Sequence, residues 1–354
     1  MSRRIQALPA VGALATALAI ASPTVALAQG GKAAPKAKAY SAPKTPWGHP
    51  DIQGMWNNAT TTPLQRPSDA GDKDTLSDEE VAQRDQEVAE LRNTDRRDEN
   101  APALGANAVR GGRGTVADVE RAYNEFWWER GKTVANKRTH LLTDPTDGKL
   151  PPLSDEGKKR LDAKKAYSAG RGPSDSWEDR RLAERCIIYR GIPPLPTGYN
   201  NNYHILQTPE YVAILQEHIN EIRVIPVDGR PHVSQPVKQW LGDSRGRWEG
   251  DTLVVETTNF SDKAMIFGYD GPLTDSLKVI ERFKRVSEDM IDYTFTVEDP
   301  KTWSKAWSGQ LPWNKTPGPL FEYACHEGNY GMKHLLSGAR AEEKAAQGKK
   351  QPSN

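Results

Sequence analysis

Residues 239–260, QWLGDSRGRWEGDTLVVETTNF, constrain the fold most because they combine glycine turns with a long strand pattern. Glu249-Gly250-Asp251 separates Arg247-Trp248 from the β-branched run at 252–258, and glycine tolerates the positive φ of a tight turn. Alternate side chains of the run point to opposite faces, and both faces carry apolar residues. The stretch therefore predicts a β-hairpin whose second strand is covered on both sides.

Short β patterns bounded by turns recur after Arg185 and favour an antiparallel architecture. The expected strands are residues 186–189, 203–207, 211–218, 222–227, 253–258, 277–285, 290–298 and 320–324. We predict a mainly β fold with flanking helices: an antiparallel barrel or sandwich, calycin-like or lipocalin-like, with N-terminal helices packed on it. Gly54-Met55-Trp56 and Gly246-Arg247-Trp248 also fit the short Gly-x-Trp pattern of lipocalin-type barrels.

Helical patterns precede the strands. Ser77 followed by Glu80 is a capping box that opens a helix to about Arg92. A second helix with an aromatic stripe is expected at 115–131, and a third after Ser154. The predicted layout is a signal peptide at 1–28, a disordered leader at 29–45, a single β-rich domain at 46–343 with a helical insertion at about 76–170, and a disordered tail at 344–354.

The first 28 residues fit a secretory signal peptide, with Arg3 and Arg4, an Ala/Leu/Val run, and Ala26-Leu27-Ala28 before the expected cleavage point. The apolar run is too short and too rich in alanine for a membrane span, and no later stretch is long enough. We therefore expect a bacterial protein that is periplasmic or secreted. Loss of two arginines changes the formal net charge from +1 to about −1, which favours neither nucleic acid nor an anionic membrane as partner.

Cys186 and Cys325 are the only cysteines, and an oxidising compartment favours a disulfide between them. Cys186 begins the β-rich part and Cys325 falls at the last expected strand, so the bond is expected to join the first and last strands where a barrel closes. The alternative is a reactive thiol in Cys325-His326-Glu327, since a neighbouring histidine lowers a thiol pKa.

Four longer segments, GRWEGDTLVVETTNF, TVEDP, EYACHEGNY and LSGARAEEK, resemble an abundant family of exported bacterial proteins. The resemblance extends over about residues 46–344. The family has no settled activity, so the resemblance implies an exported location and a common fold without a substrate. It also implies a histidine at position 220, where this chain has Asn220.

The hairpin expected at 277–298 places a carboxylate on an apolar face. With a three-residue loop at 287–289, the opposed residues of the solvent face carry matched charges: Lys278 with Glu298, and Lys284 with Asp292. Glu281 then lies on the other face with Val279, Phe283, Arg285, Ile291, Tyr293, Phe295 and Val297. Such a carboxyl either has a raised pKa that suits a general acid or base, or belongs to a structural Glu–Arg pair.

A second hairpin, at residues 201–218, brings together a histidine and a carboxylate. With Pro209-Glu210 as the turn, His204 and Glu217 lie diagonally on one face, and Asn202 lies opposite Glu217. A carboxylate that orients an imidazole is a common acid/base arrangement, and it is equally the environment of a structural histidine.

Two loops carry further candidates. The turn at 228–232 presents Arg230 and His232 together, which suits a carboxylate or enolate oxygen or ties down a loop. Four histidines are available to a metal, namely His204, His218, His232 and His326. HExxH and paired-cysteine spacings are absent, so neither a metal nor a cofactor is expected. Gly242-Asp243-Ser244-Arg245-Gly246 has the spacing of G-x-S-x-G but lies in the expected hairpin, not at the strand-to-helix turn on which a serine hydrolase places its nucleophile. P-loop and dinucleotide motifs are absent, so neither serine hydrolase nor nucleotide chemistry is expected.

We therefore predict an exported enzyme that uses acid/base side chains in an aromatic-lined β cavity on a small organic molecule, by hydrolysis, elimination or isomerisation. The expected catalytic residues are His204, Glu217, His232, Glu281 and His326. The expected ligand-binding residues are Tyr199, Asn202, Arg230, Trp248 and Glu327. One alternative is a calycin-like carrier of an apolar or aromatic molecule, and another is an envelope scaffold that binds other proteins. Convergence of the catalytic residues on one cavity would favour the enzyme.

Overall fold

The computed structural model describes residues 40–92, 128–129, 131–269 and 271–350. The expected signal peptide, residues 29–39 of the expected leader and most of the expected helix at 115–131 lie outside the described residues.

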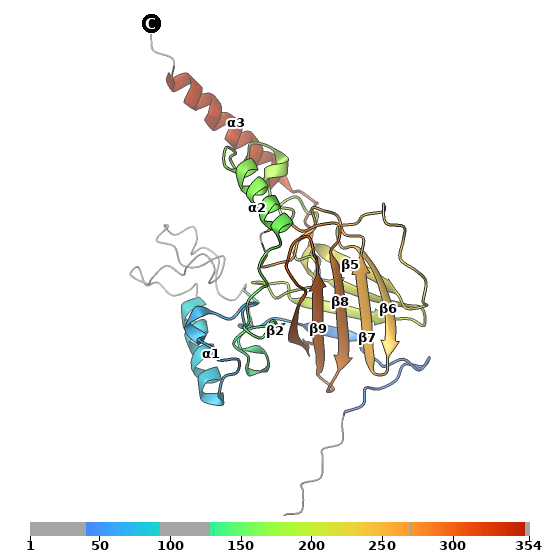
Figure 1. Ribbon diagram of the computed structural model, residues 1–354. Coiled ribbons are helices and arrows are strands. Elements are labelled where there is room, and N and C mark those ends of the chain that lie inside the picture. The colour runs from blue at the N-terminus through green and yellow to red at the C-terminus, as the bar shows by residue number, and fades with distance from the viewer. Residues whose placement is uncertain (1–39, 93–127, 130, 270, 351–354) are drawn as a thin grey trace, which may run out of the picture. The chain divides into compact units, whose positions relative to one another are not determined.

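Nine strands form one antiparallel sheet that curls into a nearly closed barrel (Figure 1). In spatial order they are β5 (Glu221–Pro226), β4 (Tyr211–Gln216), β3 (Asn202–Gln207), β1 (Gly54–Asn57), β10 (Trp307–Lys315), β9 (Met290–Glu298), β8 (Lys278–Arg285), β7 (Thr252–Thr258) and β6 (Asp243–Glu249). A short strand, β2 (Leu142–Asp144), pairs with β10 outside this order. The predicted fold class, an antiparallel β-barrel with flanking helices, is confirmed.

The odd number of strands along the sheet determines the relative direction of the two edge strands that meet where the barrel closes. All eight neighbouring pairs are antiparallel, so strand direction alternates along the sheet and the outermost strands, β5 and β6, run in the same direction. Gly246 lets β6 approach the end of β5, because an added Cβ would lie 2.8 Å from Val227 Cγ1 and 3.0 Å from Ile225 Cγ2. We call the boundary between β5 and β6 the seam; among the described strands, side chains rather than a hydrogen-bonded ladder close it.

Aromatic side chains fill the interior of the barrel. The buried rings are Trp56, Tyr203, Phe283, Tyr293, Phe295, Trp307 and Trp313. They come from alternate positions of their strands, as the two-residue period of a strand requires. Tyr203 and Trp313 stack with ring centroids 4.2 Å apart, and Gly309 leaves room for Phe295, whose Cζ would lie 2.4 Å from an added Cβ. Each such ring removes a large apolar area from water, so this cluster is a main source of stability.

Both predicted hairpins that rest on glycine and charge patterns are confirmed. Strands β6 and β7 are joined through Gly250, which has φ +60°. In the β8–β9 hairpin, Lys278 pairs with Glu298 and Lys284 with Asp292, which is the predicted register. Glu281 therefore lies on the buried face, and its side chain is 0 % exposed.

Within the described part of the chain, three α-helices lie outside the sheet: α1 (Asp78–Arg92), α2 (Asp155–Ser168) and α3 (Tyr330–Lys350). The predicted capping box opens α1, since Ser77 N donates to Glu80 Oε2 at 2.8 Å and Glu80 N donates to Ser77 Oγ at 3.2 Å. Short 3-10 turns occur at Ser68–Ala70, Ala135–Lys137, Trp177–Asp179 and His218–Asn220. Among the described residues, no helix has both the length and the apolar character needed to cross a membrane.

Several predicted elements differ from the structure. Residues 186–189 and 320–324 are not strands, and α3 occupies residues 344–350 of the expected disordered tail. The strands β1, β2 and β10 were not predicted. The predicted disulfide between Cys186 and Cys325 is present, with Cα atoms 5.7 Å apart, but it does not join the first and last strands. The barrel closes at the seam instead.

Candidate functional site

The connection between β4 and β5 is a tight 3-10 turn, His218–Asn220, with an unusual backbone. Ile219 has φ +60° and Asn220 has φ +51°, both in the left-handed region. Asparagine tolerates this region, but a β-branched residue adopts it only at a cost that the surrounding structure must supply. Backbone strain of this kind concentrates at functional sites, so the turn is a candidate functional site.

The His218 ring lies inside a set of tyrosines that come from three other segments. Its centroid is 3.6 Å from the Tyr189 ring in a stacked arrangement, 5.4 Å from Tyr199 and 4.9 Å from Tyr323. The residue is 1 % exposed, whereas all three tyrosines are half-buried. The imidazole is therefore shielded by rings that themselves reach the surface.

Neither ring nitrogen of His218 has a hydrogen-bond partner among the described residues, although both are buried. Burial, together with the positive charge of Arg190, lowers the pKa of His218 to about 3. The ring is therefore neutral at physiological pH and carries one free N–H donor and one free nitrogen acceptor. Buried polar groups are nearly always satisfied, so this orphaned ring requires an explanation.

Two carboxyls flank the turn that carries His218. Glu221 accepts hydrogen bonds from Tyr189 N and from Gln216 Nε2, both at 3.0 Å. Burial raises the pKa of Glu221 to about 7, although Arg190 and Arg223 act against the shift. A carboxyl that titrates near neutral pH both gives and takes protons readily, which is the property of a general acid or base.

Glu217 is the second carboxyl, and it is 1 % exposed. Asn202 Nδ2 donates to its Oε2 at 2.9 Å, and Asn57 Nδ2 in turn donates to Asn202 Oδ1 at 2.8 Å. Burial, followed by the charge of Glu129, raises the pKa of Glu217. The amides hold the carboxyl in place from β3 and β1.

Arg190 organises the loop that carries Tyr199. The guanidinium is 0 % exposed and donates to the carbonyl oxygens of Leu195 and Tyr199, at 3.1 and 3.2 Å, and to Thr197 Oγ1 and Tyr203 Oη, both at 2.8 Å. A fork of five N–H donors suits this role because it reaches several acceptors at once. Its charge also contributes to keeping His218 neutral.

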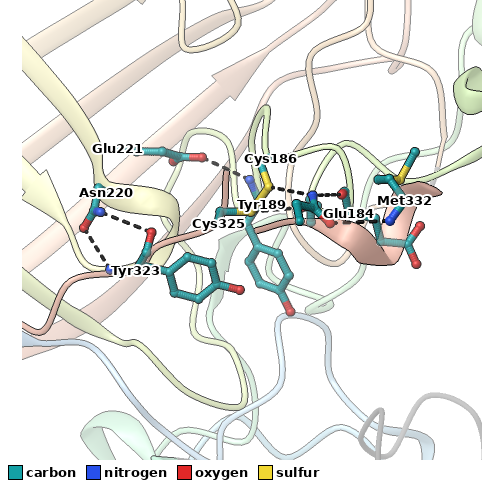
Figure 2. The surroundings of a disulfide bond; sticks show 10 residues. Glu184, Cys186, Tyr189, Asn220, Glu221, Tyr323, Cys325 and Met332 are labelled. Atoms are coloured by element: carbon teal, nitrogen blue, oxygen red, sulfur yellow. Dashed lines mark hydrogen bonds between the residues drawn. A yellow bond between two sulfur atoms is a disulfide. The ribbon is translucent and has the colours of Figure 1, made fainter. Parts of the chain in front are cut away.

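The Cys186–Cys325 bond lies beside this site (Figure 2). Residues 316–329, which we call the strap, run without helix or strand from β10 to α3 and include Cys325 and Tyr323. Asn220 holds the strap through two hydrogen bonds: its Nδ2 donates to Tyr323 O at 3.2 Å, and Tyr323 N donates to its Oδ1 at 3.4 Å. The strap thereby places the Tyr323 ring against His218.

The structure brings three of the predicted site residues to this place: Tyr199, Asn202 and Glu217. His204 lies on the opposite side of β3 from Tyr203 and Ile205 and is half-buried. Among the described residues Glu217 is bonded by Asn202, and no hydrogen bond joins it to His204.

Glu281 lies inside the barrel and forms an ion pair with Arg223. Arg223 Nη1 donates to Glu281 Oε1 at 3.0 Å and Nη2 to Oε2 at 2.5 Å, while Tyr293 Oη donates to Oε1 at 2.9 Å. The guanidinium also reaches Ser244 Oγ on β6, at 3.2 Å. Burial, followed by the Glu281 charge, raises the pKa of Tyr293 well above its ordinary value. This is the structural Glu–Arg pair considered for Glu281, and it crosses the inner face of the seam.

His232 belongs to a separate surface cluster. Its Nδ1 lies 2.8 Å from Asp243 Oδ2 and its Nε2 lies 3.5 Å from Glu256 Oε1. Arg245 also donates to Asp243, at 2.7 Å. The Asp243 carboxylate thus ties the 228–232 loop to the start of β6.

The remaining predicted residues are not grouped together, since three of them are exposed and Trp248 is half-buried. Arg230 is exposed and pairs with Asp228 and the Tyr211 hydroxyl. Trp248 contacts His49, with ring centroids 5.4 Å apart. His326 and Glu327 are exposed residues of the strap. The five residues predicted as catalytic therefore do not converge on one cavity.

Two surface hollows lie elsewhere. The larger, about 620 Å³, is bordered by the start of α2 and the loop after β9, and includes Ser154, Asp299 and Trp303. The smaller, about 400 Å³, lies next to Arg138, Met290 and Gln310. Neither contains a predicted site residue, so the side-chain chemistry points to the His218 region instead.

Sequence reasoning did not assign roles to Tyr189, Arg190, Glu221 or Tyr323, and it named His218 only as a possible metal ligand. One signal is present for Glu221: the carboxylate directly precedes the strand pattern expected at residues 222–227.

Comparisons of the chain with protein-family models, with curated proteins and with solved structures found no match. The functional assignment therefore rests on the geometry of the site.

Proposed function

We propose that the protein is an exported enzyme that binds a small planar organic molecule at the His218 site and moves a proton to or from it. The signal-peptide pattern and the disulfide support an oxidising location outside the cytoplasm. The reaction classes that fit are hydrolysis, elimination and isomerisation, because each needs a positioned acid or base.

The observation that carries the proposal is the buried His218 ring, to whose nitrogens the described residues offer no hydrogen-bond partner. A neutral imidazole that lacks protein partners has a donor and an acceptor to offer to a ligand. A buried donor or acceptor that forms no hydrogen bond costs about 1–3 kcal/mol of stability, a cost that a purely structural ring such as phenylalanine would avoid. The tyrosines around the ring favour a flat ligand, since π faces stack on one another.

Glu221 is the proposed proton acceptor or donor. It directly follows the turn that carries His218, and its pKa of about 7 keeps both protonation states populated at physiological pH. Glu217 is the second candidate, since it is also buried with a raised pKa. His218, which is neutral, orients the ligand by hydrogen bonds.

4-Nitrophenol is a suitable probe because it is planar and its absorbance distinguishes the phenol from the phenolate. Full-length protein is titrated with it, with the cystine intact and after reduction by dithiothreitol, because Tyr323 covers the ring in the oxidised form. We expect saturable binding that His218→Phe weakens at least tenfold. The matched control is His326→Phe, which changes an exposed histidine.

Proton transfer is tested separately with Glu221→Gln. We expect the bound probe to shift toward the phenolate in the wild-type protein and to lose this shift in the variant. Absence of binding in both redox states, or equal binding by His218→Phe, contradicts the proposal. If the wild-type protein and Glu221→Gln both bind the probe and give the same spectrum, the result supports a carrier that leaves its ligand unaltered, which is the calycin-like alternative.

A further inference from the structure

We infer that the Cys186–Cys325 bond locks the strap over His218, and that reduction of this bond by a dithiol opens the site. Such opening would regulate the His218 site, a role that rests on the proposed function. The geometry on which it stands is independent of any ligand.

The strap reaches His218 through one side chain. The Tyr323 ring lies 4.9 Å from the His218 ring and covers it from the side of the strap, while Tyr189 and Tyr199 come from residues before β3. Figure 2 shows Tyr323 and Tyr189 beside the cystine. We expect displacement of Tyr323 to uncover the side of His218 that faces the strap, while Tyr189 and Tyr199 stay in place.

Little apolar burial holds the strap in place. Phe321 is 66 % exposed, and Glu322, Ala324, His326 and Glu327 are also exposed. A segment that buries so little surface gains little from the hydrophobic effect and opens easily when its other attachments are lost.

The other attachments are few hydrogen bonds and one covalent bond. Near its ends, Thr316 N donates to Met55 O at 3.0 Å, and Asn329 Nδ2 donates to Glu184 O at 3.2 Å. In the middle, Asn220 holds the Tyr323 backbone, and the Phe321 backbone donates a hydrogen bond to the Glu217 carboxyl. The cystine is the covalent attachment of the strap, and it lies two residues from Tyr323.

Reduction transfers two electrons and two protons from the dithiol. One dithiol thiolate attacks a cystine sulfur, and the resulting mixed disulfide is resolved by the second thiol of the reagent. The products are the Cys186 and Cys325 thiols and the cyclic disulfide of the dithiol. Cys325 is half-buried whereas Cys186 is 5 % exposed, so we expect the dithiol to attack the sulfur of Cys325.

The test measures access to His218 in the full-length protein. Diethyl pyrocarbonate modifies unprotonated imidazoles, and peptide mass spectrometry counts the modification at each histidine. We expect the rate at His218 to rise at least tenfold after treatment with dithiothreitol. The exposed His326 and His334 should react in both states, and His140, which is 1 % exposed and lies outside the site, should stay protected.

Two variants sharpen the result. Cys186→Ser/Cys325→Ser should expose His218 without any reductant. Tyr323→Ala should expose it while the cystine is intact, whereas Phe321→Ala, a change at an exposed position of the same strap, should not.

The strap inference is overturned if His218 stays protected once both thiols are shown to be free. It is equally overturned if His140 becomes reactive together with His218, because reduction would then unfold the protein as a whole. If His218 opens but 4-nitrophenol does not bind to the reduced protein, the strap inference stands and the proposed function fails. If 4-nitrophenol binds equally in both redox states while His218 stays protected, the strap inference fails alone.

Discussion

Arg223 of β5 and Glu281 of β8 form a two-point ion pair, 3.0 and 2.5 Å long, across the inner face of the seam. The side chain of Glu281 is 0 % exposed and that of Arg223 is 10 % exposed. A pair so well shielded from water is strongly coupled, and each charge depends on the other for its compensation.

Arg223→Met tests this dependence. It leaves Glu281 buried without a counter-charge, and we expect a loss of about 3–5 kcal/mol in the free energy of unfolding, measured by urea denaturation. The double variant with Glu281→Leu should recover most of the loss. Arg282→Met is the matched control, because Arg282 lies beside Glu281 on β8 and forms an exposed ion pair with Glu249 of β6, so its loss should cost less than about 1 kcal/mol. Additive losses in the double variant would contradict the coupling.

Gly246→Ala tests the close approach at the seam. The added methyl group would clash with the side chains of Val227 and Ile225, so we expect a loss of about 1–3 kcal/mol. Gly338→Ala in α3 is the control, because nothing lies within 4 Å of its added methyl and alanine favours a helix. A neutral Gly246→Ala would show that β5 and β6 are free to separate.

His218→Phe should raise the free energy of unfolding by about 1–2 kcal/mol at pH 8, since it removes a buried polar ring that lacks partners. The gain should grow as pH falls. Below the ordinary pKa of 6.5 the unfolded chain binds a proton that the folded His218, with a pKa of about 3, does not bind. At pH 5 the additional gain is about 2 kcal/mol. Urea denaturation at both pH values, with His326→Phe as control, measures it; a destabilised His218→Phe would refute the orphaned-ring argument.

Glu221 should make the free energy of unfolding depend on pH in the opposite direction from His218, and Glu221→Gln tests this. The folded Glu221 keeps its proton up to a pKa of about 7, whereas the unfolded carboxyl loses it near 4.5, so this stability is present at pH 4 and lost as pH rises to 7. We expect the variant to lack this decrease, which amounts to about 2–3 kcal/mol. The comparison is the difference in unfolding free energy between pH 4 and pH 8, with the exposed Glu322→Gln as control. Parallel pH profiles of Glu221→Gln and wild type would rule out the raised pKa.

The barrel could be predicted from sequence where side chains alternate with a period of two. The opposed charges Lys278 with Glu298 and Lys284 with Asp292 fix the β8–β9 register because a shift by one residue would bury charge. Strand β10 was missed because Pro312 and Gly309 interrupt its pattern. The structure explains why proline is tolerated there. Pro312 pairs with Asp292 of β9, whereas β1 and β2 pair with other residues of β10, so no strand on the other side of Pro312 needs a backbone N–H from it.

The candidate site was harder to predict, for a geometric reason. His218 is buried by a turn with left-handed Ile219 and Asn220, and periodic patterns contain no sign of such a turn. Its ring contacts come from Tyr189, Tyr199 and Tyr323, which lie outside the turn and outside the strands next to it. The apolar and polar alternation near Tyr323 resembles a strand, yet that segment lies in the strap, where the cystine and Asn220 hold it outside any ladder.

The odd number of strands has a consequence for solubility. Because β5 and β6 run in the same direction, one added strand between them would be antiparallel to both, and their facing edges are therefore templates on which a second polypeptide can align. In the folded monomer Arg223 and the close contact at Gly246 keep those edges together. Replacing the ion pair by apolar residues can thus restore stability and still leave a protein that aggregates through its own edges.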